Sequence, residues 1–247
     1  MSLTELIILH TSRTSQYQLA ESAFGVKKES GQLNKTNRLI TFGCSFTFGT
    51  GLPDCKEGSA TPSNQGWPAI LSKKLNLDLV NVSASGASNF EILHNIINFD
   101  FQSSDTVIIM WTYFARDLYF RSLFSKIWPI DRLSPGSTSN SIIDNLLDTK
   151  VIVGRKWIEN MNEKTFALKT WAHIHHADLY LTSKGIKYIH FPALPDDLLK
   201  YSVPYKINNF YANGIVRLDV ATDNMHPGIK TNEHTANSIY NILNEQI

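Results

Sequence analysis

Cysteine is nearly absent from this chain: Cys44 and Cys55 are the only two in 247 residues. Two thiols cannot form a disulfide framework, and no Cys-x-x-Cys pair indicates a zinc or redox site. Long apolar runs are also missing, since none approaches the roughly 18 residues that cross a bilayer. The N-terminus lacks the basic stretch and apolar run of a signal peptide. We therefore expect a soluble protein of the reducing cytoplasm, with no membrane partner.

An excess of charge of one sign is missing as well. The chain has 23 Lys and Arg residues against 22 Asp and Glu residues, which gives a net charge of +1. Nucleic-acid-binding proteins usually carry a basic excess or basic runs. We therefore expect no nucleic-acid partner, while the hydrophobic share of 43% is ordinary for a protein with a packed core. The composition does not predict an oligomeric state.

From Arg38 onward the chain alternates between short apolar runs and amphipathic segments. Strands are predicted where apolar, β-rich runs meet turn residues, at Leu39–Phe42, Leu77–Val82, Thr106–Trp111 and Ile186–Phe191. Helices are predicted where apolar residues recur every three or four positions, at Gly66–Leu75, Ser88–Phe101, Asn162–Ser183 and Thr231–Leu243. This order predicts the α/β class, a three-layer α/β/α sandwich around a mostly parallel sheet, with Thr106–Trp111 as a central strand.

We expect one domain over residues 1–247, with two segments that the alternation does not explain. Residues 1–36 are predicted to be an N-terminal extension. Residues 113–185 give no strand signal and are predicted to be a mainly helical insertion. Such an insertion near the strand ends forms either a lid or substrate wall, or extra helices packed against the sheet.

Three short segments carry residues suited to serine chemistry, each beside a predicted element. Gly43-Cys44-Ser45-Phe46-Thr47 follows the first strand, and residues 81–88 (NVSASGAS) follow the second. Asp223-Asn224-Met225-His226-Pro227 comes just before the last helix. Open α/β sheets bind their ligands at the carboxyl ends of the strands, where the first two segments lie.

These residue types match the needs of a catalytic serine. A serine is a weak nucleophile unless a histidine takes its proton, and the histidine needs a third group to hold its ring. An Asp three residues before a His supplies that group within one turn. The attacked carbonyl needs backbone N–H donors, and Gly86 lets a substrate approach the backbone closely.

Each pattern also has another interpretation. Gly-x-Ser is common, and Asp-x-x-His also occurs as an ordinary helix N-terminal turn. The glycine-bearing loop of residues 43–51 favours phosphate or nucleotide binding in a flavodoxin-like protein, yet it lacks a P-loop ending and leaves Asp223 and His226 without a role. His173 and His176 share a helix face, but no carboxylate has a matching ligand spacing, so a polar helix face is favoured over a metal site.

Together, the three segments resemble the SGNH (GDSL-type) hydrolases, and the resemblance runs from about Arg38 to the C-terminus. In that family the first block is Gly-Asp-Ser, the second is Asn-x-Gly-x-x-Gly-Ala-Thr and the last is Asp-x-x-His-Pro. The matching residues here are Gly43, Ser45, Asn81, Gly86, Ala87, Ser88, Asp223, His226 and Pro227. Ser83 stands in the place of the family's first glycine in the second block.

The resemblance implies a catalytic site and a reaction. Ser45 would be the nucleophile, His226 its base and Asp223 the acid that orients the base, with the N–H groups of Ser45 and Gly86 forming the oxyanion hole. The reaction would be hydrolysis of a short acyl or acetyl ester, carried by a small molecule, a glycan or a lipid, through an acyl-enzyme. No metal or organic cofactor would be needed. The same residues would also serve an acyltransferase.

The chain departs from the family at two places. Cys44 replaces the aspartate of Gly-Asp-Ser, either as a buried thiol or as a reactive one. After Val107–Trp111 the family has Gly-x-Asn-Asp, whose asparagine completes the oxyanion hole, whereas residues 111–116 read WTYFAR. Thr112, Arg116 and Asn89 are the candidate replacements. We hypothesise that Arg116 contacts an anionic or polar substrate group, and a non-catalytic binding module remains an alternative reading.

Overall fold

The computed structural model describes residues 37–56, 58–120, 130–133 and 162–245, all of which belong to the unit Thr36–Ile247. The predicted N-terminal extension, residues 1–36, lies outside the described residues. The same holds for the stretches 121–129 and 134–161 of the predicted insertion. The division into a single domain with an extension and an insertion therefore stays a prediction.

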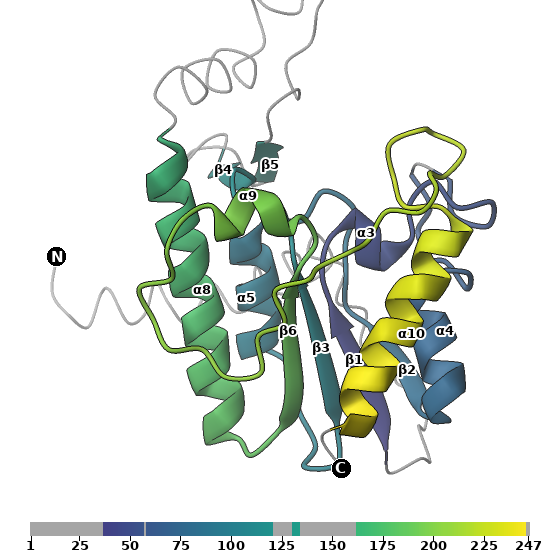
Figure 1. The fold of residues 1–247 in the computed structure, drawn as a ribbon, viewed down its shortest axis with the longest axis horizontal. Helices are drawn as coiled ribbons and strands as arrows, with labels where there is room; N and C mark the ends of the chain where they lie inside the picture. Colours follow the sequence, from purple (N-terminus) through teal and green to yellow (C-terminus); the bar gives the residue numbers. More distant parts are fainter. Residues whose placement is uncertain (1–36, 57, 121–129, 134–161, 246–247) are drawn as a thin grey trace, which may run out of the picture. The chain divides into compact units, whose positions relative to one another are not determined.

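A four-stranded parallel sheet runs through the middle of this unit (Figure 1). Its strands, in spatial order, are β2 (Asp78–Asn81), β1 (Arg38–Phe42), β3 (Thr106–Trp111) and β6 (Lys187–Pro192). All four predicted strands are confirmed to within two residues at each end. The apolar strand β3 lies between β1 and β6, and Val107–Trp111 are buried, as expected for a strand covered on both faces.

Helices cover both faces of the sheet, which confirms the three-layer α/β/α architecture (Figure 1). Helices α4 (Trp67–Leu75) and α10 (Ile229–Glu245) pack together on one face, and α5 (Asn89–Ile97) and α8 (Glu163–Ser183) on the other. Side chains alternate between the faces along a strand. In β3, accordingly, Val107, Ile109 and Trp111 join the α5/α8 core, whereas Ile108 and Met110 join the α4/α10 core.

Helix α5 begins at a cap formed by Ser88, one of two residues (Ser88 or Asn89) that the sequence offers for this position. Ser88 accepts a hydrogen bond from the N–H of Glu91, whose carboxylate accepts one from the N–H of Ser88 in return. The helix ends at Ile97, four residues before the predicted end. The spacing of Phe90, Leu93 and Ile97 predicts one apolar face, but the buried stripe is Ile92, Leu93 and Ile96. The prediction is confirmed at Leu93 and wrong at Phe90 and Ile97, which are 42% and 46% exposed.

The predicted insertion contains strands as well as a helix, which contradicts the expectation of no strand between 113 and 185. β4 (Asp117–Phe120) and β5 (Ile130–Leu133) form a two-stranded antiparallel sheet. Four-residue strands interrupted by charges, DLYF and IDRL, give too short an apolar pattern to recognise. Helix α8 is confirmed and is capped by the side chain of Asn162, which accepts from the N–H of Thr165.

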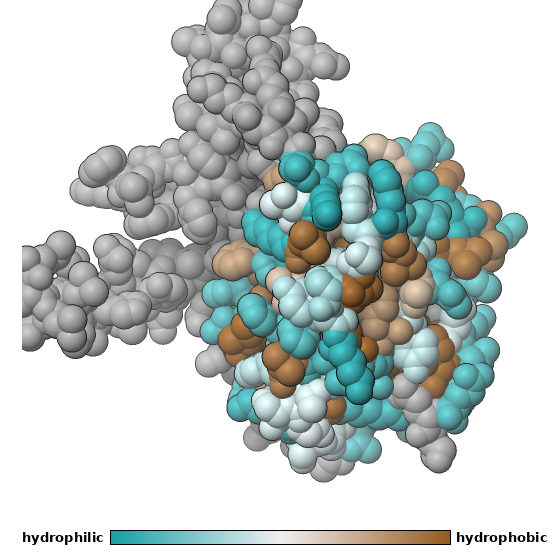
Figure 2. Space-filling view, turned by 60° about the vertical axis from the view of Figure 1, so that its left-hand side comes forward, coloured by the Kyte–Doolittle hydropathy of each residue, from teal (hydrophilic) through white to brown (hydrophobic). Residues whose placement is uncertain are grey.

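The surface of the described unit mixes hydrophobic and hydrophilic residues, as Figure 2 shows for one face. Leu168 and Leu179, which the sequence places on the apolar face of α8, are 38% and 53% exposed. Trp171 and Ile174 are fully buried, as predicted. Among the helices that the structure describes, none has the length and apolar character to cross a membrane.

Candidate active site

Ser45 lies where β1 ends and a short helix, α3 (Ser45–Phe48), begins. The sequence predicts a turn here, and the structure shows one helical turn whose Thr47 and Phe48 N–H groups both donate to the carbonyl of Cys44. Ser45 is 2% exposed, and its Oγ has no hydrogen-bond partner within the described part of the chain. The hydroxyl is thus left without a competing acceptor inside the fold.

Gly43 is required for this sharp exit from the strand. A Cβ at this position would overlap the side chain of Thr47 and lie 3.2 Å from the carbonyl oxygen of Met110 in β3. Cys44, where the family has aspartate, is buried at 2% exposure, which fits the structural reading of this thiol.

Asp223 and His226 form a hydrogen-bonded pair within one turn before α10. His226 Nδ1 lies 2.6 Å from Asp223 Oδ2, so Nδ1 carries the proton that the carboxylate accepts. Asp223 Oδ1 also accepts from the backbone N–H groups of Met225 at 2.9 Å and His226 at 3.0 Å. Burial by itself raises the pKa of Asp223, but these backbone bonds and the ring outweigh it and lower the pKa to about 2. The second ring nitrogen, Nε2, is left as the acceptor.

The start of α10, three residues after His226, is anchored by contacts distant in sequence. The Asp219 carboxylate accepts from the N–H groups of Lys230 (3.1 Å) and Thr231 (2.8 Å), which supplies the cap that α10 lacks locally. Asn232 accepts from the N–H of Trp67 at 2.9 Å, which ties α10 to the first residue of α4. The base therefore precedes a helix whose first turn is held at several points.

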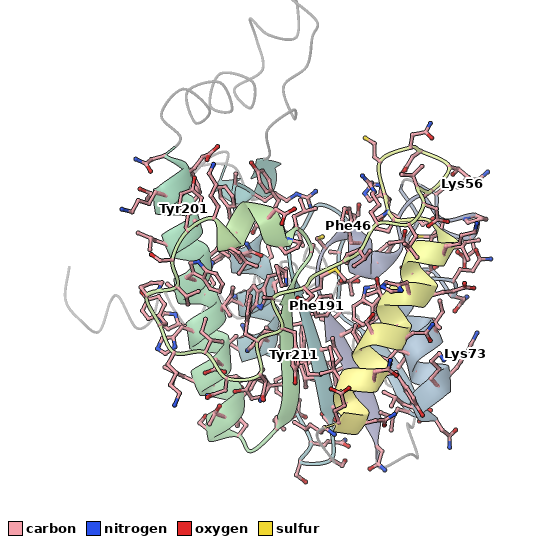
Figure 3. The ribbon with its side chains drawn as sticks, viewed as in Figure 1. Phe46, Lys56, Lys73, Phe191, Tyr201 and Tyr211 are labelled. Carbon is pink, nitrogen blue, oxygen red and sulfur yellow. The ribbon has the colours of Figure 1, made fainter. Side chains whose placement is uncertain are left out.

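Phe46 connects the serine turn to the histidine. Its ring meets the His226 ring edge-on, with centroids 5.7 Å apart, and Phe46 is the neighbour of Ser45 in the chain. Figure 3 shows Phe46 at the end of the sheet where α3 begins. Phe48 is buried at 9% exposure. Phe48 is thus part of the core, whereas Phe46 lies against the candidate base.

Gly51 is a site residue that sequence reasoning missed. The Thr222 N–H and hydroxyl both donate to the Gly51 carbonyl, at 3.3 Å and 2.9 Å. A Cβ on Gly51, whose φ is +87°, would overlap Asp223 Oδ2 and lie 2.8 Å from Asp223 Cγ. Only glycine leaves room for the carboxylate here. A glycine before a turn has no recognisable pattern of its own, so nothing in the sequence linked Gly51 to residue 223.

The segment after β2 is tied to the serine turn, and Gly86 lies within it. Asn81 donates from Nδ2 to the carbonyl of Thr47 at 3.2 Å, and the N–H of Ala84 donates to the carbonyl of Gly43 at 3.3 Å. Gly86 has a φ of +77°, a conformation that favours glycine. In the described residues, no hydrogen bond from the N–H of Ser45 or of Gly86 is seen. Both donors lie at the carboxyl edge of the sheet.

Asn89, Thr112 and Arg116 form one connected group after β3. The Asn89 amide donates to the Thr112 carbonyl (3.2 Å) and to Thr170 Oγ1 (3.1 Å), and it accepts from the Thr112 N–H (2.9 Å). Because both of its amide hydrogens are engaged, Asn89 holds the Thr112 backbone in place and has none left for a ligand. Arg116 Nη1 donates to Thr112 Oγ1 at 3.0 Å.

The histidines outside this site have structural surroundings. His173 lies against Phe90, and His175 stacks on Tyr205 with centroids 4.7 Å apart. Within the described residues no group of three His, Cys, Asp or Glu side chains is placed to hold a metal ion. His190 is fully buried in β6 and accepts from Trp111 Nε1 at 3.2 Å.

Comparison with known proteins shows the fold. No protein-family model matches the chain, and no curated protein matches it. Among solved structures, an acetyl xylan esterase (Est2A) from the rumen bacterium Butyrivibrio proteoclasticus is 12% identical, with 85% of this chain and 64% of that chain covered and a TM-score of 0.51. A carbohydrate esterase, whose active site is described as having divergent catalytic and non-catalytic binding functions, is 12% identical, with coverage of 87% and 67% and a TM-score of 0.50. A psychrotrophic esterase from Pseudoalteromonas sp. is 12% identical, with coverage of 85% and 98% and a TM-score of 0.46.

The chain spans about two thirds of the length of the first two of these proteins. Their likeness, together with the parallel sheet of order β2-β1-β3-β6 and helices on both faces, gives this chain the fold of the SGNH hydrolases. Fold alone does not assign chemistry, which depends on the residues of the site.

Proposed function

We propose that this chain is a serine hydrolase of the SGNH family that cleaves a carboxylic ester. The observation that carries the proposal is the 2.6 Å bond between Asp223 and His226, whose ring contacts Phe46, the residue after a buried, unpartnered Ser45 at a strand-to-helix turn. An ionised carboxylate on Nδ1 leaves Nε2 to act as a base, as a nucleophilic serine requires.

The reaction has two stages. Ser45 Oγ attacks the ester carbonyl carbon as His226 Nε2 takes the hydroxyl proton, and the tetrahedral intermediate collapses when the same proton passes to the departing alcohol. Water then attacks the acyl-serine, His226 takes its proton, and the carboxylic acid leaves as Ser45 is restored. Asp223 stabilises the imidazolium in both stages. An alcohol in place of water would make the reaction an acyl transfer.

The negative oxygen of each intermediate is assigned to the N–H groups of Ser45 and Gly86. The family's asparagine donor has no counterpart after β3, and one such donor contributes about 3 kcal/mol of transition-state stabilisation elsewhere. Thr112 and Arg116 are the remaining candidates for a third donor, because the Asn89 amide is used within the fold. The substrate class is a short acyl or acetyl ester on a carbohydrate or lipid, in keeping with the acetyl xylan esterase among the structural neighbours.

A fluorophosphonate probe tests the nucleophile. We expect it to label the wild-type protein, and labelling to be lost in Ser45→Ala and His226→Ala because one lacks the nucleophile and the other the base. Ser183→Ala is the control, since this exposed serine lies at the end of α8 and should leave labelling unchanged. Circular dichroism checks that each variant is folded, and intact-protein mass spectrometry counts the adducts.

A non-catalytic ligand-binding module is the second candidate. It is favoured by the missing asparagine after β3 and by the Ser45 hydroxyl, which has no hydrogen bond to His226 in the described structure. Catalytic hydrogen bonds are often long in unliganded enzymes, so this geometry also fits an enzyme. A folded wild type that takes up no fluorophosphonate would favour the module and overturn the hydrolase.

A substitution at Gly51 tests whether the Asp223 carboxylate needs the space that this glycine leaves. Gly51→Ala should slow fluorophosphonate labelling and ester hydrolysis by about 100-fold, because the new methyl group displaces the carboxylate that orients the base. Gly58→Ala is the matched control: its φ of +82° imposes a similar backbone strain, but nothing lies within 4 Å of the added Cβ. Equal rates for both variants would show that Asp223 does not depend on Gly51.

A further inference from the structure

Arg116 follows the strand that neighbours the serine turn. Strands β1 and β3 are adjacent and parallel; Ser45 opens α3 three residues after the end of β1, and Thr112 is the first residue after β3. Adjacent strands lie about 4.8 Å apart. Arg116 closes a turn, its N–H donating to the carbonyl of Tyr113 at 3.1 Å, and its guanidinium returns to Thr112 Oγ1. The cation is therefore attached to a residue at the same carboxyl edge of the sheet as the candidate nucleophile.

The serine turn also lies against the end of β3. A Cβ on Gly43 would lie 3.2 Å from the carbonyl oxygen of Met110, two residues before Thr112. Phe46 of the same turn contacts the His226 ring. The Arg116 anchor and the candidate base thus both adjoin the serine turn at the carboxyl end of the sheet.

The charge of Arg116 is not neutralised by the fold. The side chain is half-buried. Within the described part of the chain it takes part in no ion pair, whereas Arg38, at the opposite end of the sheet, is paired with Asp105 at 2.7 Å. Placing a cation partly out of water is unfavourable unless an anion accompanies it.

The Arg116 guanidinium is also held in position before any ligand binds. Asn89 binds both the N–H and the carbonyl of Thr112, and Thr112 Oγ1 accepts from Arg116 Nη1. The other guanidinium N–H groups have no acceptor in the described residues. A guanidinium presents several donors in one plane, an arrangement that suits a carboxylate or phosphate bound through two oxygens.

We propose that Arg116 binds an anionic group of the substrate, so that the ester cleaved at Ser45 carries a carboxylate, phosphate or sulfate near its carbonyl. This inference rests on the proposed ester hydrolysis and specifies its substrate class. Arg116 is the specificity-determining residue, and Thr112 with Asn89 positions it. A neutral acetyl ester would then be a poor substrate compared with an anionic ester of the same size.

Two matched ester pairs test the preference and locate the anion. On the acyl side, 4-nitrophenyl hemisuccinate is compared with neutral 4-nitrophenyl butyrate; on the alcohol side, 4-acetoxybenzoate is compared with 4-acetoxybenzamide. In one of the two pairs we expect the wild type to favour the anionic ester. Arg116→Gln, which keeps donors for Thr112, should lower the ratio of kcat/KM for the anionic ester to kcat/KM for its neutral partner by about 10- to 100-fold. Lys73→Gln is the control for lost charge, since Lys73 is exposed on α4 away from Phe46 (Figure 3).

The outcomes separate this inference from the proposed function. Hydrolysis of both members of each pair with equal kcat/KM, or an unchanged preference in Arg116→Gln, would overturn the anion site while leaving the esterase intact. If no ester is cleaved and Ser45 takes no fluorophosphonate, the hydrolase fails, and calorimetric binding of succinate then tests the site alone. Succinate binding that is lost in Arg116→Gln but kept in Lys73→Gln would support the site, and equal binding by all three proteins, or none, would reject it.

Discussion

An Asp223→Asn variant should hydrolyse a test ester about 10,000-fold more slowly than the wild type while it stays folded. The Asp223 carboxylate holds the proton on His226 Nδ1, at 2.6 Å, and so leaves Nε2 free to accept the serine proton. An asparagine amide donates to Nδ1 instead, which stabilises the tautomer with its proton on Nε2. The side-chain oxygen that accepts from the N–H groups of Met225 and His226 is retained, so the turn should keep its shape.

The measurement is kcat for a chromogenic ester, with circular dichroism as the check on folding. Asn224→Gly is the matched control, because Asn224 lies in the same turn with a φ of +58°, which glycine adopts without strain. We expect the control to retain wild-type activity. A loss of less than about tenfold in Asp223→Asn would mean that the pair serves the fold and not the chemistry.

The second large effect concerns stability in acid and centres on His190. This ring is fully buried in β6, and burial lowers its pKa from 6.5 to about 3. Asp178 Oδ1 lies 3.9 Å from His190 Nε2 and by its charge would favour a protonated ring. Burial outweighs this attraction, because the carboxylate already accepts from the hydroxyl of Tyr188 (2.6 Å) and from the N–H of Asn208 (3.0 Å).

The sign of the pH dependence follows from these values. In the unfolded chain the histidine binds a proton below about pH 6.5, whereas the folded ring stays neutral until about pH 3. The unfolded state therefore binds more protons in this window, and the free energy of unfolding falls as the pH falls. Between pH 6.5 and 4 the loss should be about 3 kcal/mol. Asp223, whose pKa is lowered to about 2, adds a further loss only below about pH 4.

Urea unfolding at pH 7, 6, 5 and 4 measures this dependence. His190→Gln should remove most of the slope, since its amide oxygen still accepts from Trp111 Nε1 but does not titrate. The control is His176→Gln, because His176 is exposed on α8 and should keep the wild-type slope. A wild type as stable at pH 4 as at pH 7 would contradict the assignment of a neutral, buried His190.

The elements that the sequence predicts well are those whose information is local. β3 is marked by five consecutive apolar residues after Thr106, and α5 by a Ser88 suited to cap its start. The pairing of Asp223 with His226 is local too, because the two residues share one turn. In each case the interacting groups are close in the chain, so the spacing of residue types is enough to recognise them.

The sequence by itself therefore determined the α/β/α class, the main strands and helices, and the candidates Ser45, Asp223 and His226. Only the tertiary structure decided which helix face is buried, as Phe90 and Ile97 show, and what surrounds the candidates. Gly51 lies against a carboxylate 172 positions later, Asp219 caps a helix from outside it, and Arg116 lacks an acidic partner in the described residues. These relations depend on how distant segments meet in space, and residue spacing along the chain carries no record of that.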